Sequence, residues 1–109
     1  MFMGLIVMQR MNNLKVKRIE NISREKLAKY FSITREAIEK AIKSKSKFND
    51  DVRSDFLNMI ESYYKDAKYF ESKGDVVSAF AALNYAHGWL DAGARIGVFL
   101  VKDSRLFTV

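Results

Sequence analysis

The stretch that decides the fold covers residues 63–97 and reads YYKDAKYFESKGDVVSAFAALNYAHGWLDAGARIG. Two segments with apolar residues at helical spacing flank the tripeptide Lys73-Gly74-Asp75. Glycine commonly ends a helix in the left-handed conformation, and aspartate is a favoured N-cap for the helix that follows. A connection this short favours antiparallel neighbours. The stretch therefore predicts a helical hairpin that turns at Gly74.

The second helix of this hairpin is almost free of charge, because Asp91 and Arg95 are the only charged residues between positions 76 and 101. At about 100° per residue its apolar side chains occupy two roughly opposite faces. A helix with that pattern is central in a bundle or buried in an oligomer. Two flanking helices do not easily cover such a helix all round, so we expect self-association or a protein partner. The residues expected at this interface are Tyr85, Trp89, Ile96 and Phe99.

Two further helices are predicted upstream, each with apolar residues at steps of three and four. The first begins at Ser23 or Arg24 and ends at about Lys45. The second is capped by an oxygen-bearing side chain within residues 49–51 and ends before Gly74. Together with the hairpin, these segments predict an all-α fold, an antiparallel three-helix bundle in up-down-up order.

At 109 residues, the chain is long enough for one domain with a single core. We expect a flexible basic N-terminal segment at residues 1–22, the bundle at residues 23–97 and a loosely held C-terminal tail at residues 98–109. The opening MFMGLIVM is too short to span a bilayer and has no preceding basic residue, unlike a signal peptide. A cytoplasmic protein without membrane contact is therefore expected.

The amino-acid composition excludes several kinds of functional site. The chain has no cysteine, which excludes disulfides, thiolate metal sites and cysteine nucleophiles. His87 is the single histidine, which excludes a histidine-rich metal cluster. A glycine-rich phosphate loop is also missing. We therefore expect neither a metal nor a cofactor.

The charge of the chain is unevenly distributed. Residues 1–47 carry twelve basic and four acidic side chains, whereas residues 48–109 carry seven basic and nine acidic ones. Such asymmetry can indicate a nucleic-acid surface, but it is also typical of a solvated helix face with a basic tail, which we favour. The residues that would contact phosphates are Lys15, Lys17, Arg18, Lys26, Lys29 and Arg35. A nucleic-acid-binding accessory protein is therefore the alternative function.

A polar stripe on the last helix suggests a network or an active site. Asn84, His87, Asp91 and Arg95 recur at steps of three and four, so His87 and Asp91 can meet. If the hairpin folds about Gly74, Tyr63 and Asp66 lie opposite this stripe. The six residues can form a buried network that fixes helix register, or His87 and Asp91 can act as a general base with a tyrosine as acid. We favour the structural interpretation, because no nucleophile accompanies the pair.

Glycines on the same helix allow two further interpretations. Gly88, Gly93 and Gly97 permit close approach of another backbone, and each costs about 1 kcal/mol in a helix interior relative to alanine. A compensating contact is therefore expected. Either these glycines form a dimer seam, or they allow tight packing inside one bundle.

The chain also resembles an archaeal family known as domain of unknown function 357. Fourteen residues carry the resemblance: Tyr64, Asp66, Ala67, Phe70, Gly74, Asp75, Ala79, Ala86, His87, Gly88, Trp89, Leu90, Asp91 and Gly93. It covers about the last two thirds of the chain and implies a small three-helix protein of the archaeal cytoplasm, with no activity assigned. With the apolar last helix, it leads us to expect a non-enzymatic interaction module that self-associates or docks a protein partner.

Overall fold

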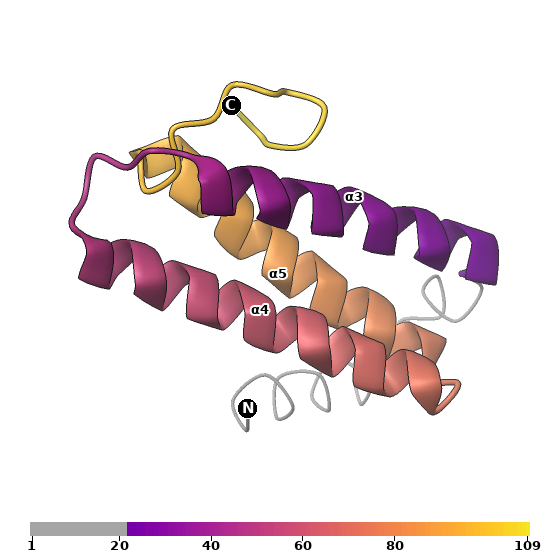
Figure 1. The fold of residues 1–109 in the computed structure, drawn as a ribbon. Helices are drawn as coiled ribbons and strands as arrows, with labels where there is room; N and C mark the ends of the chain where they lie inside the picture. The colour runs from indigo at the N-terminus through magenta and orange to yellow at the C-terminus, as the bar shows by residue number, and fades with distance from the viewer. Residues whose placement is uncertain (1–21) are drawn as a thin grey trace.

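The computed structural model describes residues 22–109 and contains three helices there (Figure 1). They are α3 (Arg24–Lys43), α4 (Asp50–Ser72) and α5 (Val76–Ile96). Helices α3 and α5 run in the same direction and α4 runs against them, and no strand occurs in this part of the chain. The predicted all-α, up-down-up bundle is therefore confirmed. The N-terminal segment predicted at residues 1–22 falls outside the described residues, apart from Ile22.

The ends of the helices follow from local sequence. Each helix begins after a residue whose side-chain oxygen accepts a hydrogen bond of 3.0 Å from the backbone N–H three positions later: Ser23, Asn49 and Asp75. Such N-caps satisfy N–H groups that have no partner within the helix. Gly74 and Gly97 follow α4 and α5 with φ angles of +76° and +89°. That left-handed conformation favours glycine and stops each helix there.

Helix α5 lies between the other two and supplies much of the core (Figure 1). Its buried residues are mostly small: Ser78, Ala79, Ala81, Ala82, Leu83, Ala86, Leu90 and Gly93. Larger buried side chains pack from the neighbours, Phe31 and Ile38 from α3 and Ile60 and Tyr63 from α4. Small residues on the central helix and large ones on its neighbours interdigitate to fill the core.

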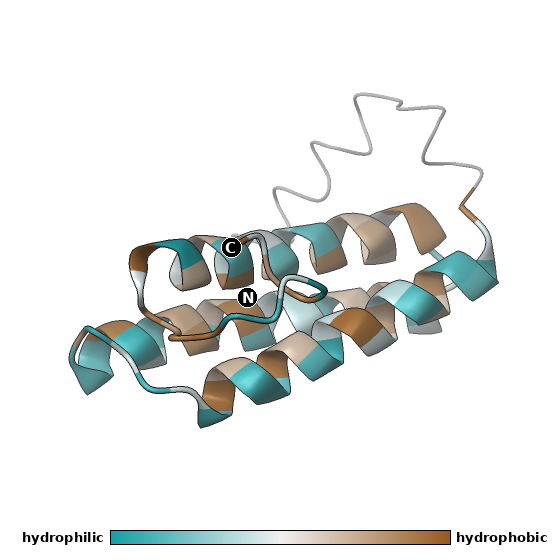
Figure 2. Cartoon of the chain, turned by 90° about the horizontal axis from the view of Figure 1, so that it is seen from above, coloured by the Kyte–Doolittle hydropathy of each residue, from teal (hydrophilic) through white to brown (hydrophobic). Residues whose placement is uncertain are grey.

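The C-terminal segment, residues 98–109, is packed onto the bundle. Figure 2 shows that it leaves α5 as a hydrophobic stretch. Val98 and Phe99 are fully buried, and Leu106 and Phe107 nearly so. The prediction of a loosely held tail is therefore wrong. The physical reason is that four apolar side chains of this segment gain burial by joining the core.

Two backbone hydrogen bonds fasten the start of this segment to the α3–α4 loop. The N–H of Lys47 donates to the Gly97 carbonyl, and the N–H of Leu100 donates to the Lys45 carbonyl, each at 2.8 Å. Beside them, the Arg53 guanidinium on α4 donates to the carbonyls of Ala41, Ile42 and Ser44 at the end of α3. The last carbonyls of a helix lack partners in a following turn, so Arg53 helps to cap α3 together with Ser44, whose N–H and hydroxyl donate to the Ala41 carbonyl.

Gly93 makes room for Phe99. A Cβ at Gly93 would lie 2.6 Å from two ring carbons of Phe99 and 3.3 Å from Phe56. We predict that Gly93→Ala lowers the free energy of unfolding by about 1–3 kcal/mol, the usual cost of overpacking, although alanine is the better helix former. Denaturant unfolding of Gly93→Ala, Phe99→Leu and the double variant checks this. A favourable coupling energy is expected in the double variant, and a Gly93→Ala protein as stable as the wild type would contradict the packing.

Candidate functional site

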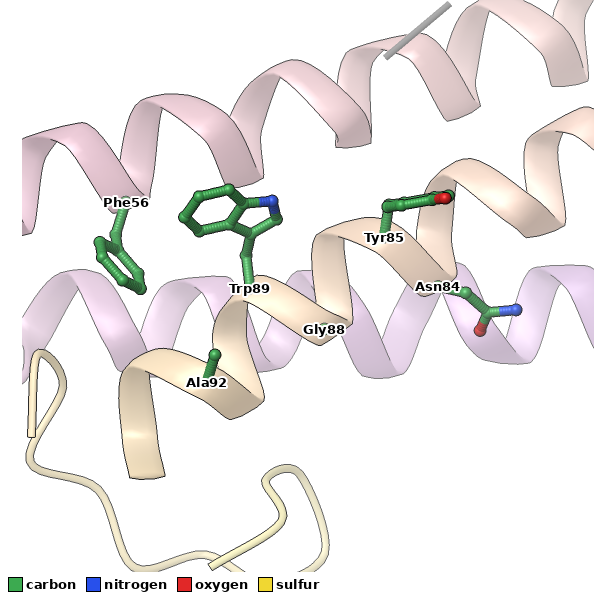
Figure 3. Close-up of a pocket in the computed structure, with 6 residues that line it drawn as sticks. All are labelled: Phe56, Asn84, Tyr85, Gly88, Trp89 and Ala92. Atoms are coloured by element: carbon green, nitrogen blue, oxygen red, sulfur yellow. The ribbon is translucent and has the colours of Figure 1, made fainter. Parts of the chain in front are cut away.

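An open apolar groove runs along α5 on the side of α4 (Figure 3). It has a volume of about 540 Å³. Its lining is almost entirely apolar and comes from one residue of α4 and five of α5: Phe56, Asn84, Tyr85, Gly88, Trp89 and Ala92. A hollow of this size and polarity is typical of a surface that binds an apolar group or an apolar helix.

Aromatic contacts with α4 hold the wall of this groove in place. The ring of Trp89 meets the ring of Phe56 edge to face, with centroids 5.0 Å apart (Figure 3). The ring of Tyr85 stacks on that of Tyr63, with centroids 5.3 Å apart. Both geometries are favourable for aromatic pairs. Trp89 and Tyr85 are only half-buried by them, so each presents a fixed apolar surface to the groove.

The floor of the groove is bare backbone at Gly88. A Cβ placed there would meet nothing within 4 Å, whereas one at Gly93 on the same helix would clash. Gly88 is in the middle of α5 and is exposed, as are Asn84 and Ala92, one turn away on either side. No contact among the described residues thus explains the glycine, although it costs about 1 kcal/mol relative to alanine. Of the two interpretations of the glycines, tight packing within the bundle holds for Gly93 and leaves Gly88 unexplained.

The four residues expected at an interface lie in two different environments. Tyr85 and Trp89 line the groove, and Ile96 at the end of α5 is 53% exposed. Phe99 is fully buried against Gly93 and Phe56. The expectation for Phe99 is wrong, because the chain turns back after Gly97 and carries this ring into the core. An interface formed by Tyr85, Trp89 and Ile96 stays a prediction.

The predicted polar stripe is divided by the fold. His87 lies beside α3 and the C-terminal segment, where its Nε2 donates to the Leu106 carbonyl at 2.6 Å. In the neutral ring, Nδ1 is then an acceptor, and the Thr34 hydroxyl lies 3.3 Å from it. The Asp91 carboxylate is 3.9 Å from Nε2 and accepts from the backbone N–H and the hydroxyl of Thr108. Histidine and aspartate meet as predicted, but their strongest contacts are with other residues.

The other members of the expected network lie elsewhere. Tyr63 is buried in its stack with Tyr85, and Asp66 is one turn further along α4. The side chains of Asn84 and Arg95 make no hydrogen bond or ion pair within residues 22–109. The six-residue network is therefore a wrong prediction. Tyr85 and His87 are two positions apart on α5, about 200° around the helix, so their partners come from different elements.

Burial also sets the electrostatics near Tyr63. One carboxylate oxygen of Asp66, Oδ2, is buried and has no hydrogen-bond partner in the described part of the chain. Loss of solvation raises the pKa of Asp66. Burial likewise raises the pKa of Tyr63, with smaller contributions from Tyr85 and Asp66. Asp66 is thus an acid whose charged form is poorly accommodated.

Ion pairs at the surface hold the C-terminal segment to α3. Arg105 binds Glu36 through both guanidinium nitrogens, and Lys40 donates to Asp103 at 2.7 Å. These hydrogen bonds lower the pKa of Glu36 and that of Asp103. Sequence reasoning missed this set, because the partners are more than sixty residues apart. It also missed Thr34, although a hydroxyl within an apolar helix face was a usable sign of a buried partner.

The structure describes three of the six residues that were predicted to contact phosphates. Lys15, Lys17 and Arg18 lie outside the described residues, and Lys26 and Lys29 are exposed on α3. Arg35 is engaged, because its guanidinium lies 3.4 Å from the Glu61 carboxylate and 5.2 Å from the centroid of the Tyr64 ring. Nucleic-acid binding stays a prediction from the sequence.

Residues 22–109 lack two features. They contain no group of three or more histidine, aspartate or glutamate side chains that could hold a metal ion. None of their helices is sufficiently long and apolar to cross a membrane.

If His87 joins α5 to the C-terminal segment, its loss should destabilise the fold. His87→Ala leaves the buried Thr34 hydroxyl and the Leu106 carbonyl without their partner, so we predict a loss of about 1–3 kcal/mol in the free energy of unfolding. Asp91→Asn keeps an oxygen that accepts from Thr108 and should cost less. Thermal and denaturant melts check both. Neutral or stabilising results at the two positions would overturn the structural role and favour the active-site interpretation.

Asp66 should make stability depend on pH. Because its folded-state pKa is raised, the folded protein retains a proton that the unfolded chain has lost. Stability is therefore expected to fall as pH rises from the unfolded-state pKa, about 4, through the raised value. Asp66→Asn should flatten this part of the stability profile and be at least as stable as wild type at pH 7. A profile that Asp66→Asn leaves unchanged between pH 3 and pH 8 would show that the carboxylate is well solvated.

The chain matches the model of one protein family. Residues 29–99 match the model of a family described as protein of unknown function (DUF357), and the match takes in α4, α5 and most of α3. Searches among curated proteins and among solved structures found no match. The family match covers well over half of the chain and includes every residue that lines the groove. The chain therefore belongs to the DUF357 family.

Proposed function

We propose that this protein is a non-enzymatic interaction module that binds an apolar α-helix in the groove between α4 and α5. The helix can come from a second copy of the chain or from another protein. The observation that carries the proposal is the combination of fixed aromatic walls, Trp89 and Tyr85, with a floor of bare backbone at Gly88. Trp89 and Tyr85 also pack on Phe56 and Tyr63, but no contact among the described residues explains Gly88.

The shape of the groove suits a helix. Helix-binding grooves are apolar troughs that accept side chains spaced by three or four residues. A glycine floor lets the backbone of another helix approach closely. Tryptophan and tyrosine are the side chains most often found at the energetic centre of protein interfaces. The polar side-chain groups of the lining residues are the hydroxyl of Tyr85, the amide of Asn84 and the indole N–H of Trp89.

The contacts of His87 support a module without catalysis. Both of its ring nitrogens have partners within the fold, Leu106 and Thr34, and Asp91 binds Thr108. A general base needs a nitrogen free to face a substrate. The groove lining itself offers no nucleophile with an adjacent base.

A variant that fills the floor of the groove tests the proposal. We predict that Gly88→Gln leaves the fold intact, since nothing lies within 4 Å of its Cβ, but weakens binding of an apolar helix at least tenfold. A synthetic peptide with the sequence of α5, in which phenylalanine replaces Trp89, is the probe, so the fluorescence of the protein's single tryptophan is the readout. Ala28→Gln, on the exposed face of α3, is the matched control.

Light scattering of the full chain from about 1 µM to 1 mM complements the titration. Wild type and Ala28→Gln should bind the peptide or self-associate, and Gly88→Gln should do neither at the same concentrations. A protein that stays monomeric, and whose tryptophan emission does not respond to the peptide, would contradict the proposal. Equal binding by Gly88→Gln would place the binding surface elsewhere.

A further inference from the structure

Helix α5 carries a protruding apolar side chain as well as the groove. Ile96 is 53% exposed at the last position of the helix, eight residues after Gly88. Eight residues correspond to about 12 Å along the axis. Tyr85, Trp89 and Ile96 recur at steps of four and seven, so they lie on one side of the exposed stripe formed by Asn84, Gly88 and Ala92. The protruding side chain of Ile96 and the groove at Gly88 therefore lie on the same face of α5, about two helical turns apart.

The opposite side of the same stripe carries one charge of each sign. Asp91 and Arg95 are four residues apart and lie side by side along the helix. Arg95 is exposed and has no ion pair with any residue in the range 22–109. The Asp91 carboxylate binds Thr108 and is itself only partly buried, so it can accept another donor.

We infer that the occupant of the groove is α5 of a second copy of this chain, which crosses antiparallel with Ala92 of both copies at the two-fold axis. This inference rests on the function proposed above and names the partner. In an antiparallel pair centred on Ala92, Ile96 of each copy lies opposite Gly88 of the other. Its side chain then fills the groove between Tyr85 and Trp89.

The charges favour the same arrangement. A two-fold axis brings like flanks of the two helices together, with the direction of one reversed. Asp91 of each copy then lies at nearly the height of Arg95 of the other, which gives two ion pairs. A parallel two-fold pair would instead bring opposite flanks together, so the charged flank of each helix would lie beside the apolar flank of the other and would form no ion pair.

The position of the two-fold axis along α5 is also restricted. If the axis moved one turn toward Gly88, Ile96 would lie opposite residue 80, which is outside the groove. If it moved one turn toward Ile96, this side chain would meet its own copy and the groove would stay empty. Only the pair centred on Ala92 fills both grooves and pairs both charges. Because the contact involves one face of one helix, we expect a weak dimer with a dissociation constant on the order of 10 µM.

Site-directed disulfides test the inference sharply, because the native chain has no cysteine. Three variants of the full chain are needed: Ala92→Cys, Gly88→Cys and Ile96→Cys. A disulfide requires Cα atoms within about 7 Å. Mild oxidation should link Ala92→Cys to itself. A mixture of Gly88→Cys with a mass-tagged Ile96→Cys should give the mixed dimer at least fivefold above either homodimer. Glu39→Cys, exposed on α3, gives the background from random collisions.

The outcomes separate this inference from the proposed function. Homodimers of Gly88→Cys and of Ile96→Cys in place of the mixed product would indicate a parallel pair and overturn the inference. Linkage at the background level, in a protein that still binds the α5 peptide, would show that the groove binds an apolar helix although two full chains do not pair in this way, and would overturn the inference alone. Background linkage without peptide binding would reject both proposals.

A charge variant provides a check that involves no cysteine. Arg95→Glu should lower the thermal stability at low concentration only slightly, because Arg95 has no ion pair with a described residue but lies in the last turn of α5, where a positive charge is favourable. It should weaken self-association at least tenfold, since it removes two ion pairs and places two acidic groups at each contact. Sedimentation equilibrium measures the change. Undiminished self-association of Arg95→Glu would also overturn the antiparallel arrangement.

Discussion

The structure depends on the need to cover a helix that is almost free of charge. Asp91 and Arg95 are the only charged side chains of helix α5. Most of the helix surface is therefore apolar and has to be buried by other elements. Its small residues determine how close those elements come. Gly93 is the tightest of these points, because it admits Phe99 from the C-terminal segment together with Phe56 from α4.

Three elements share this task. Helix α4 covers one side with its aromatic residues, and α3 covers a second with Phe31 and Ile38. The C-terminal segment covers part of a third, where Leu106 and Thr108 bond to His87 and Asp91. The side that carries Gly88 is exposed. A fourth helical neighbour would cover this side, and for that reason we propose that binding occurs there.

The sequence predicted the helices well, because their limits are set locally. Ser23, Asn49, Asp75 and the two left-handed glycines act through bonds to residues within four positions. Apolar spacing then identified the core faces. Helical spacing also set Tyr85 and Trp89 on the side of α5 away from its main core face, and the structure places both in the lining of the groove.

What escaped prediction depends on contacts between distant parts of the chain. The chain returns after Gly97, and this return buries Phe99 and places Leu106 over His87. No short-range pattern encodes it, so the segment resembles a loose tail. The polar stripe failed for a related reason. Spacing shows that His87 and Asp91 can meet. It does not show that His87 has Thr34 as a partner or that Asp91 accepts a hydrogen bond from Thr108.

The central claim is that α5 is covered on three sides and binds a second helix on the fourth. A dilution series of two-dimensional nitrogen–proton NMR spectra tests it most directly. The account predicts that the indole signal of Trp89 and the amides of Gly88 and Ala92 shift with protein concentration, whereas the amides of Ala86 and Leu90, which face the core, stay constant. Spectra that do not change up to 1 mM, or shifts centred on α3, would contradict it.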